Sequence, residues 1–222
     1  MRNDLVDLLW EGLRQTLYML IWSSLFAILF GLLLGVTLVA TEKGGVLENR
    51  PIHKIVSLVI NGIRSLPFII LIVLLIPVAR WVVGTSLGPT AAVVSLSIGA
   101  APFLGRIVES ALKEVVAGKI EAAKSFGASP LTIIFRVLIP EALPALVRSL
   151  TIAVIAITEL TAVAGAIGAG GLGSLAIRFG YQRFRLDIMI ATVIVIILLV
   201  QTIQWTGDAI ARSINRRRYK PE

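Results

Sequence analysis

Residues 15–41 read QTLYMLIWSSLFAILFGLLLGVTLVAT, a run of 27 residues without a charged side chain. A helix of about 20 apolar residues crosses the hydrocarbon core of a bilayer, so this run is long enough to span it. It is too long for the apolar region of a signal peptide, and acidic residues precede it: Asp4, Asp7 and Glu11. We therefore expect a retained membrane helix here.

Four further apolar stretches follow along the chain. Together with the first, the expected spans are about residues 15–41, 55–79, 85–105, 149–168 and 188–207. None of them alternates apolar and polar residues with period two, which argues against a membrane barrel. The sequence therefore predicts an all-α polytopic membrane protein, with five transmembrane helices in a single domain over residues 1–222.

The composition agrees with a membrane protein. Hydrophobic residues make up 57% of the chain and charged residues 15%, against about 25% charged in a soluble domain. This excludes an ordinary soluble enzyme, a disordered chain and a coiled coil. There is no cysteine, and His53 is the one histidine. We predict no catalytic residue and no metal site.

Basic residues are distributed unequally between the two sides of the expected spans. Segments 42–54 and 106–148 and the tail after 208 carry 14 of the 21 basic residues, and the opposite side carries 6. The positive-inside rule then predicts the N-terminus outside and the C-terminus in the cytoplasm. The tail RSINRRRYK can bind anionic membrane lipid. Since topology accounts for the net charge of +8, no nucleic-acid partner is expected.

The expected cytoplasmic loop, residues 106–148, contains two short helices. The first ends near Phe126, with Gly127 in a C-terminal capping position. The second begins with Ser129 as N-cap and Pro130 as its first residue. Its apolar positions follow helical spacing: Leu131, Ile134, Phe135 and Leu138.

Pro140 is expected to end this second helix, because proline has no backbone N–H to donate. Ten residues make about 15 Å of helix, half the thickness of a membrane core. Its polar face is thin, with Thr132 and Arg136. We therefore expect it to dock into a groove of a partner protein rather than lie on the lipid surface.

The same loop resembles the EAA loop of ABC-importer permeases. That pattern is Glu-Ala-Ala, three residues, Gly, nine residues, then Ile-x-Leu-Pro. This chain keeps every spacing and differs by Val137 for Ile and Ile139 for Leu. The resemblance implies a coupling helix held in a groove of a cytoplasmic ATPase subunit. The docking residues it implies are Glu121, Ala122, Ala123, Gly127, Ser129, Pro130, Leu131, Ile134, Phe135 and Pro140, with Glu121 and Gly127 the critical ones.

Four further motifs extend the resemblance over nearly the whole chain: RSLPF at 64–68, GTSLG at 84–88, GAAPF at 99–103 and GAIGAGGLG at 165–173. They are similar to the small five-span permease of methionine importers. The resemblance implies a homodimer in the inner or plasma membrane, with two ATP-binding subunits and an extracytoplasmic binding protein. It implies import of a small amino acid, methionine first, by alternating access. The alternatives are another amino acid, a short peptide, or an ATP-independent transporter or channel.

The chain contains no Gly-x4-Gly-Lys-Ser/Thr sequence, whose backbone amides and lysine would cradle phosphates. We therefore expect ATP and Mg on a partner ATPase subunit, no cofactor in this chain and no enzyme activity of its own. Gly168, Gly170 and Gly173 do satisfy G-x-G-x-x-G, but they follow an apolar membrane run. We expect a turn or helix break there.

Arg64 and Glu159 are charges inside expected spans. An ionised carboxylate at the centre of a membrane helix costs about 2.5–3.5 kcal/mol, so Glu159 should face protein or water. One interpretation is a structural pair with Arg64, or hydrogen bonds to Thr158 or Thr161. The other is a pathway position that meets the ammonium group of an amino acid. An acid at this position departs from the methionine permease pattern.

Overall fold

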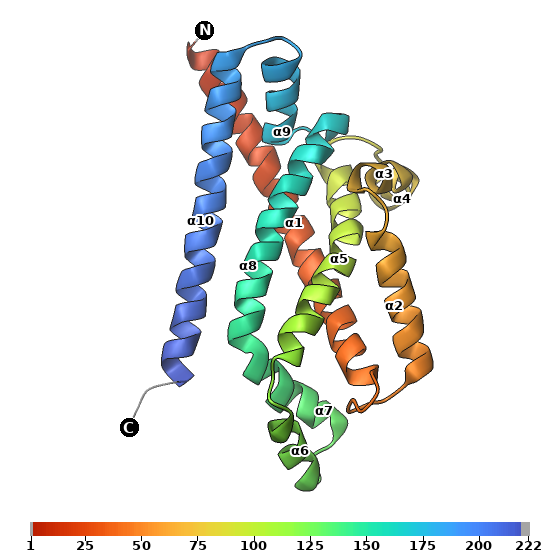
Figure 1. Ribbon diagram of the computed structural model, residues 1–222. Helices are drawn as coiled ribbons and strands as arrows, with labels where there is room; N and C mark the ends of the chain where they lie inside the picture. The colour runs from red at the N-terminus through yellow and green to blue at the C-terminus, as the bar shows by residue number, and fades with distance from the viewer. Residues whose placement is uncertain (1, 219–222) are drawn as a thin grey trace. The chain divides into compact units, whose positions relative to one another are not determined.

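The computed structural model describes residues 2–218 and the side chains of residues 5–215, and in that part of the chain it contains helices and no strand (Figure 1). The elements are α1 (Arg2–Thr41), α2 (Arg50–Arg64), α3 (Phe68–Leu74), α4 (Ile76–Val83), α5 (Pro89–Lys113), α6 (Ala117–Ser125), α7 (Pro130–Ile133), the π-helix η1 (Ile134–Leu138), α8 (Ile139–Ala164), the π-helix η2 (Gly165–Ala169), α9 (Gly171–Leu175), the π-helix η3 (Ala176–Tyr181) and α10 (Leu186–Arg218).

Four helical stretches are long and apolar enough to cross a membrane: Leu5–Thr41, Pro89–Lys113, Pro130–Ala169 and Leu186–Asn215. The pair α2 and α3 adds a fifth if it is counted as one broken span. The prediction of an all-α polytopic membrane protein is therefore confirmed. The expected single-domain organisation stays a prediction.

The second expected span, 55–79, is wrong as a continuous helix. The chain bends by 104° between α2 and α3. Pro67 lies at this break with an extended ψ of 133°. A proline disfavours helical backbone in the residue before it, here Leu66, and donates no backbone hydrogen bond, so the helix does not continue through this position. A second short break at Leu75 separates α3 from α4. Apolar composition indicated the membrane here but not the direction of the chain.

The boundaries of the third and fourth spans also differ from those expected. α5 runs from Pro89 to Lys113 rather than ending at residue 105, because its charged end is paired within the protein. The helix that begins at Pro130 continues to Ala169, so Pro140 does not end it. Just before Pro140, the N–H of Ile139 donates to the carbonyl of Ile134 in a wider π-turn, and the helix continues through it.

These boundaries shorten the loop that was expected to be cytoplasmic. Residues 106–113 belong to α5, and residues 130–148 belong to the helix that continues into the fourth span. Only residues 114–129, with α6 among them, connect the two long helices.

The chain packs as two compact units. Unit 1 comprises Met1–Ala27, Leu66–Ala100 and Val154–Gln204. Its core contains Met19, Ile72, Ala92, Val93, Leu96, Ala164 and Ala169. Unit 2 comprises Ile28–Ser65, Ala101–Ala153 and Trp205–Glu222. Its core contains Val108, Ala111, Leu112, Leu138, Ala142 and Leu146.

In unit 2, two glycines let α1 approach α5 closely. A Cβ atom built on Gly31 would lie 2.5 Å from Cβ of Leu104, and one on Gly35 would lie 2.5 Å from Cγ1 of Val108. Such distances leave no room for a side chain. The GxxxG sequence of α1 therefore packs inside the chain, in the manner of small-residue contacts between membrane helices.

In unit 1, the expected break after the fourth span is confirmed. Ile167 and Gly168 leave helical geometry, and Gly168, Gly170 and Gly171 have φ values of 101°, 82° and 81°. Glycine is suited to this left-handed backbone, which side chains disfavour. The following helix α9 then packs with Gly173 directly against Ala162 of α8.

Candidate functional site

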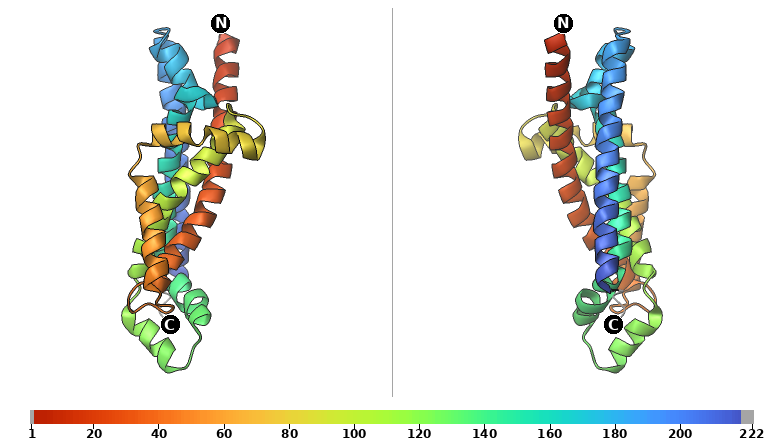
Figure 2. Two further views of the ribbon diagram at one scale, coloured as in Figure 1. Left: turned by 90° about the vertical axis from the view of Figure 1, so that its right-hand side faces the viewer. Right: turned by 90° about the vertical axis from the view of Figure 1, so that its left-hand side faces the viewer.

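The first candidate site is the segment from α6 through η1, residues 117–138, which we call the docking segment. It projects beyond the adjoining ends of α5 and α8 in unit 2, at the bottom of Figure 1, and the side views agree (Figure 2). α6 packs against α7 and η1 and has no fully buried residue. The segment therefore presents much of its surface outward from unit 2.

The turn inside the docking segment has a well-defined geometry. Gly127 has φ of +74°, its N–H donates to the Lys124 carbonyl at 2.9 Å, and the N–H of Ala128 donates to the Ala123 carbonyl at 3.1 Å. These are the paired bonds of a Schellman motif, which ends α6. Ser129 then accepts the N–H of Thr132 through its Oγ at 3.3 Å and caps α7. Both predicted caps are confirmed.

Large apolar side chains point outward from the docking segment. Phe126 is 90% exposed, Phe135 65% and Leu131 61%. Ile134, which was expected to dock, is 3% exposed and packs inside unit 2 with Leu138. Helical spacing placed Leu131, Ile134, Phe135 and Leu138 on one face, but the segment is apolar around most of its circumference. The structure therefore divides them between an inner pair and an outer pair.

The EAA residues lie on α6. Glu121 and Ala122 are exposed and Ala123 is half-buried. Within the part of the chain that the structure describes, the Glu121 carboxylate has no hydrogen bond or ion pair, so it is open to a partner. Pro130, the remaining predicted docking residue apart from Pro140, is exposed at the start of α7.

Two lysines hold α6 to the rest of unit 2. Lys119 Nζ lies 2.7 Å from Oε2 of Glu141 in the first turn of α8, and Lys124 Nζ lies 3.5 Å from the carbonyl oxygen of Gly44. The N–H of Gly44 donates to Glu48, and this hydrogen bond lowers the pKa of that carboxyl group. The docking segment is thus tied to α8 and to the loop after α1.

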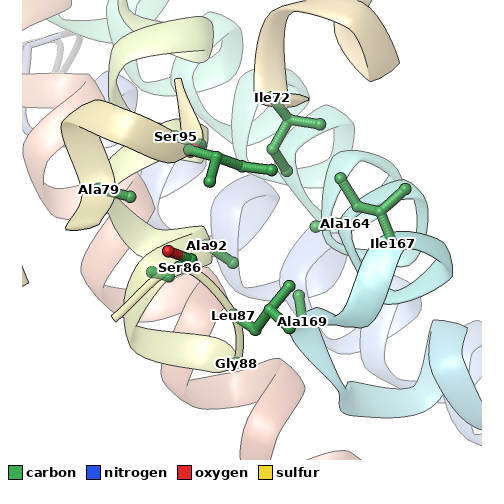
Figure 3. A pocket seen from close by; sticks show the side chains of 12 residues that line it. Ile72, Ala79, Ser86, Leu87, Gly88, Ala92, Ser95, Ala164, Ile167 and Ala169 are labelled. Carbon is green, nitrogen blue, oxygen red and sulfur yellow. The ribbon is translucent and has the colours of Figure 1, made fainter. Parts of the chain in front are cut away.

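The second candidate site is a small, partly open hollow in unit 1, which the sequence did not indicate (Figure 3). A hydrogen bond from the N–H of Gly88 to the carbonyl of Gly168, 3.2 Å long, brings two of its walls together. All of its lining residues are uncharged, and the hydroxyl groups of Ser86 and Ser95 are its polar side-chain groups. The lining residues are Ile72, Ile76, Ala79, Ser86, Leu87, Gly88, Ala91, Ala92, Ser95, Ala164, Ile167 and Ala169. Its chemistry suits an apolar side chain.

The two charges expected inside spans, Arg64 and Glu159, lie in different units of the described chain. Arg64 is exposed at the end of α2, and Glu159 is exposed on α8. Arg64 belongs to unit 2 and Glu159 to unit 1, and within its own unit neither side chain makes an ion pair or a hydrogen bond in the described part of the chain. Thr161 is buried and donates to the carbonyl of Thr158, so the predicted hydrogen bond to Glu159 does not form. Hydrogen bonding to Thr161 is therefore not seen, and the pairing of Glu159 with Arg64, which belongs to the other unit, stays a prediction.

These features define a polytopic α-helical membrane protein with a projecting helix pair at one end. The chain belongs to the family of binding-protein-dependent transport system inner membrane components, whose family model matches residues 27–218. It is therefore a permease of the ABC-importer type, as the EAA spacing indicated.

Individual relatives cover nearly the whole chain. It is 48% identical over 211 residues to the probable D-methionine transport system permease protein MetI of Vibrio cholerae, covering 95% of this chain and 94% of the relative. It is also 48% identical over 214 residues to the methionine import system permease protein MetP of Bacillus subtilis, covering 96% of each. A chain of the inward-facing MetNI methionine ABC transporter superposes with a TM-score of 0.94 at 42% identity, covering 96% of this chain and 99% of that one.

Proposed function

We propose that this chain is the permease subunit of an ATP-driven importer of methionine. It acts as a homodimer with two cytoplasmic ATP-binding subunits and receives its substrate from an extracytoplasmic binding protein. Support for the substrate comes from two relatives that are 48% identical and are named as methionine permeases. Support for ATP-binding partners comes from the 42% identical chain of a methionine ABC transporter.

The single observation that carries the proposal is the outer face of the docking segment. Phe126, Leu131 and Phe135 are large, apolar and exposed beyond the ends of two long helices. Aromatic anchors of this kind contribute strongly when they fill a pocket of a partner protein. Glu121 adds an unpaired carboxylate to the same segment. Together these features fit a groove of a cytoplasmic ATP-binding subunit.

In the proposed mechanism, ATP binding closes the two ATP-binding subunits, and this movement draws together the docking segments of the two permease chains. The spans then open outward to receive substrate, and hydrolysis returns the pathway to its inward-facing state. The docking segment can transmit such a movement because η1 continues directly into α8, with no flexible linker between them. The uncharged hollow of unit 1 suits the thioether side chain of methionine, which is apolar and adaptable.

The proposed orientation has the N-terminus outside and the C-terminus in the cytoplasm. The docking segment then lies on the side of the ATP-binding subunits. The lipid-binding tail proposed from the sequence lies largely outside the described side chains, which end at residue 215. Its arginines and lysine at 216–218 and 220 therefore support the orientation through sequence alone.

Co-purification tests the docking proposal. The tagged chain is co-expressed with a candidate ATP-binding subunit, and the retained ATP-binding subunit is quantified. Truncating Phe135 and Leu131 to alanine removes the outer anchors, and we expect at least about tenfold less retained subunit, since buried aromatic anchors each contribute about 2 kcal/mol or more. Phe184→Ala is the matched control, because Phe184 is 83% exposed in unit 1, outside the docking segment.

Retention equal to wild type in the double variant would contradict the docking assignment. The same preparations test whether ATP hydrolysis belongs to the partner subunit. The chain alone should hydrolyse no ATP, and the assembled complex should hydrolyse ATP and take up methionine in proteoliposomes. Vanadate-sensitive ATPase activity from the chain alone, or a complex that transports amino acids without ATP, would overturn the proposed function.

A further inference from the structure

Glu159 lies far from any other charge along α8. The stretches on either side of it, residues 149–158 and 160–177, contain no charged residue. At about 1.5 Å of rise per residue, about 16 Å of helix separates it from Arg148, roughly half of a 30 Å hydrocarbon core. The carboxylate therefore lies at membrane depth and not at the surface.

Among the described residues of unit 1, the carboxylate also lacks a partner. Its two nearest hydroxyl groups along the helix are committed to the backbone: Thr158 donates to the carbonyl of Val154 at 3.1 Å, and Thr161 donates to the carbonyl of Thr158 at 2.7 Å. A hydroxyl group has a single hydrogen to donate. Neither threonine is therefore available to the exposed Glu159 carboxylate.

The helix face around Glu159 is open. Positions three, four and seven residues away lie on the same face of a helix, and here they are exposed or half-buried: Ile152, Ala156, Val163 and Ala166. Lipid would suit the apolar members of this face, but an ionised carboxylate at this depth costs about 2.5–3.5 kcal/mol in hydrocarbon. In the assembled transporter, this face is therefore covered by protein or by water.

We propose that Glu159 lines the translocation pathway and binds the ammonium group of the amino acid in transit. The proposal rests on the proposed importer function and adds a site to it. An ammonium group and a carboxylate form a short, charge-assisted hydrogen bond. The hollow in unit 1 has no charged lining residue, so it offers the ammonium group no counter-charge. Glu159 supplies one in the same unit.

The ammonium group can come from two sources, and the test separates them. One is the α-ammonium group of a zwitterionic substrate such as methionine, and the other is the side-chain ammonium group of a basic amino acid such as lysine. Uptake of both is measured in proteoliposomes that contain the full complex with its binding protein. If Glu159→Gln reduces methionine uptake, Glu159 binds the α-ammonium group. If the substitution reduces only lysine uptake, Glu159 binds the side-chain ammonium group of lysine.

We expect Glu159→Gln to reduce uptake of the amino acid that Glu159 binds about tenfold or more, because hydrogen bonds to charged groups are strong and this one is desolvated. Melting temperature, co-purification and basal ATPase activity should stay at wild-type values, since the carboxylate has no contact among the described residues of unit 1. Glu159→Asp keeps the charge and should retain most of the uptake. Glu114→Gln is the control, because Glu114 is exposed and has no ion pair among the described residues.

Wild-type uptake of both substrates by a folded Glu159→Gln complex would overturn this proposal while leaving the importer function intact. A wild-type complex that transports neither amino acid would instead count against the proposed function. If the variant melts lower than wild type, carbodiimide labelling of the wild-type complex decides. A water-soluble carbodiimide should modify Glu159, and methionine or lysine should protect it while N-acetylmethionine, which has no ammonium group, should not. Absent labelling, or labelling without protection, would overturn the site.

Discussion

Gln15 accepts a hydrogen bond from the backbone N–H of Gly171 at 2.7 Å, although 156 residues separate the two in sequence. One residue later in both segments, Oγ1 of Thr16 accepts the N–H of Leu172 at 2.9 Å. Helix α9 begins at Gly171, directly after the glycine-rich break, so its first N–H groups have no carbonyl one turn earlier in a helix. α1 supplies the missing acceptors.

Replacing Gln15 by leucine should therefore destabilise unit 1. The N–H of Gly171 would be left without a partner in a part-buried place, which costs about 1–3 kcal/mol. For a chain of this size that corresponds to a melting temperature lower by about 2–12 °C. Thermal unfolding of the purified protein in detergent measures it, with Gln201→Leu on the exposed surface of α10 as the matched control. Equal melting of the two variants would contradict the capping role.

A network of four charges holds the end of α5 in unit 2. The buried Glu109 lies 2.7 Å from Arg106 Nη1 and 2.9 Å from Lys113 Nζ. Lys113 also lies 2.7 Å from Glu42, and Arg106 donates to Asn61 at 3.0 Å. Two positive and two negative side chains thus balance where the long helices meet the loop after α1.

Glu109→Gln should destabilise the protein, because it leaves two cations with one acidic partner. Removing one member of a buried pair costs about 3–5 kcal/mol, and less where the partners reach solvent, as Arg106 and Lys113 do. We expect the melting temperature to fall by about 3–10 °C. Glu114→Gln is the control, since Glu114 is exposed five residues further along and has no ion pair among the described residues. A wild-type melt of Glu109→Gln would show that the network contributes nothing.

Features determined by neighbouring residues could be predicted from the sequence. Gly127 and Ser129 were assigned as caps, and the structure places both as expected, because each motif closes within a few residues. The break after α8 was also predicted, since several glycines lie close together in the sequence there.

Features that depend on distant contacts could not be predicted. Pro67 and Pro140 look alike in sequence, yet the chain bends by 104° at the first and continues as a helix through the second. The difference lies in the π-turn before Pro140, whose residues Ile134 and Leu138 are buried. Spacing alone placed Ile134 on the outer face. Since the helix is apolar on all sides, which of its residues are buried depends on packing in unit 2, and Ile134 is among the buried ones. The contact between Gln15 and Gly171 has no local signal.

Membrane orientation can be tested by reporter fusions. The distribution of 14 basic residues on one side against 6 on the other predicts a cytoplasmic C-terminus. A fluorescent protein that matures only in the cytoplasm should be bright when fused after Glu222 and dark when fused before Met1. A periplasmic phosphatase should show the reverse. A dark fusion after Glu222, in protein shown to be inserted, would contradict the orientation and place the docking segment on the wrong side for an ATP-binding subunit.

Gly127 allows the sharpest test of the docking segment, because its surroundings separate backbone strain from steric contact. A Cβ atom built there has no atom within 4 Å, so a side chain fits, but the φ of +74° is disfavoured for every residue with a side chain. Valine is among the worst residues in this conformation and asparagine among the best after glycine. We therefore expect Gly127→Val to disturb the turn between α6 and α7 and Gly127→Asn to preserve it.

In transport assays, Gly127→Val should reduce ATP-driven uptake about fivefold or more and should reduce co-purification with the ATP-binding subunit. Gly127→Asn should stay within about twofold of wild type in both. The two variants add side chains of similar volume and differ mainly in their tolerance of left-handed backbone, so their difference isolates the Schellman turn. Equal losses in both would mean that any side chain at this position obstructs the partner. Wild-type behaviour of Gly127→Val would show that the orientation of α7 relative to α6 is not needed for coupling.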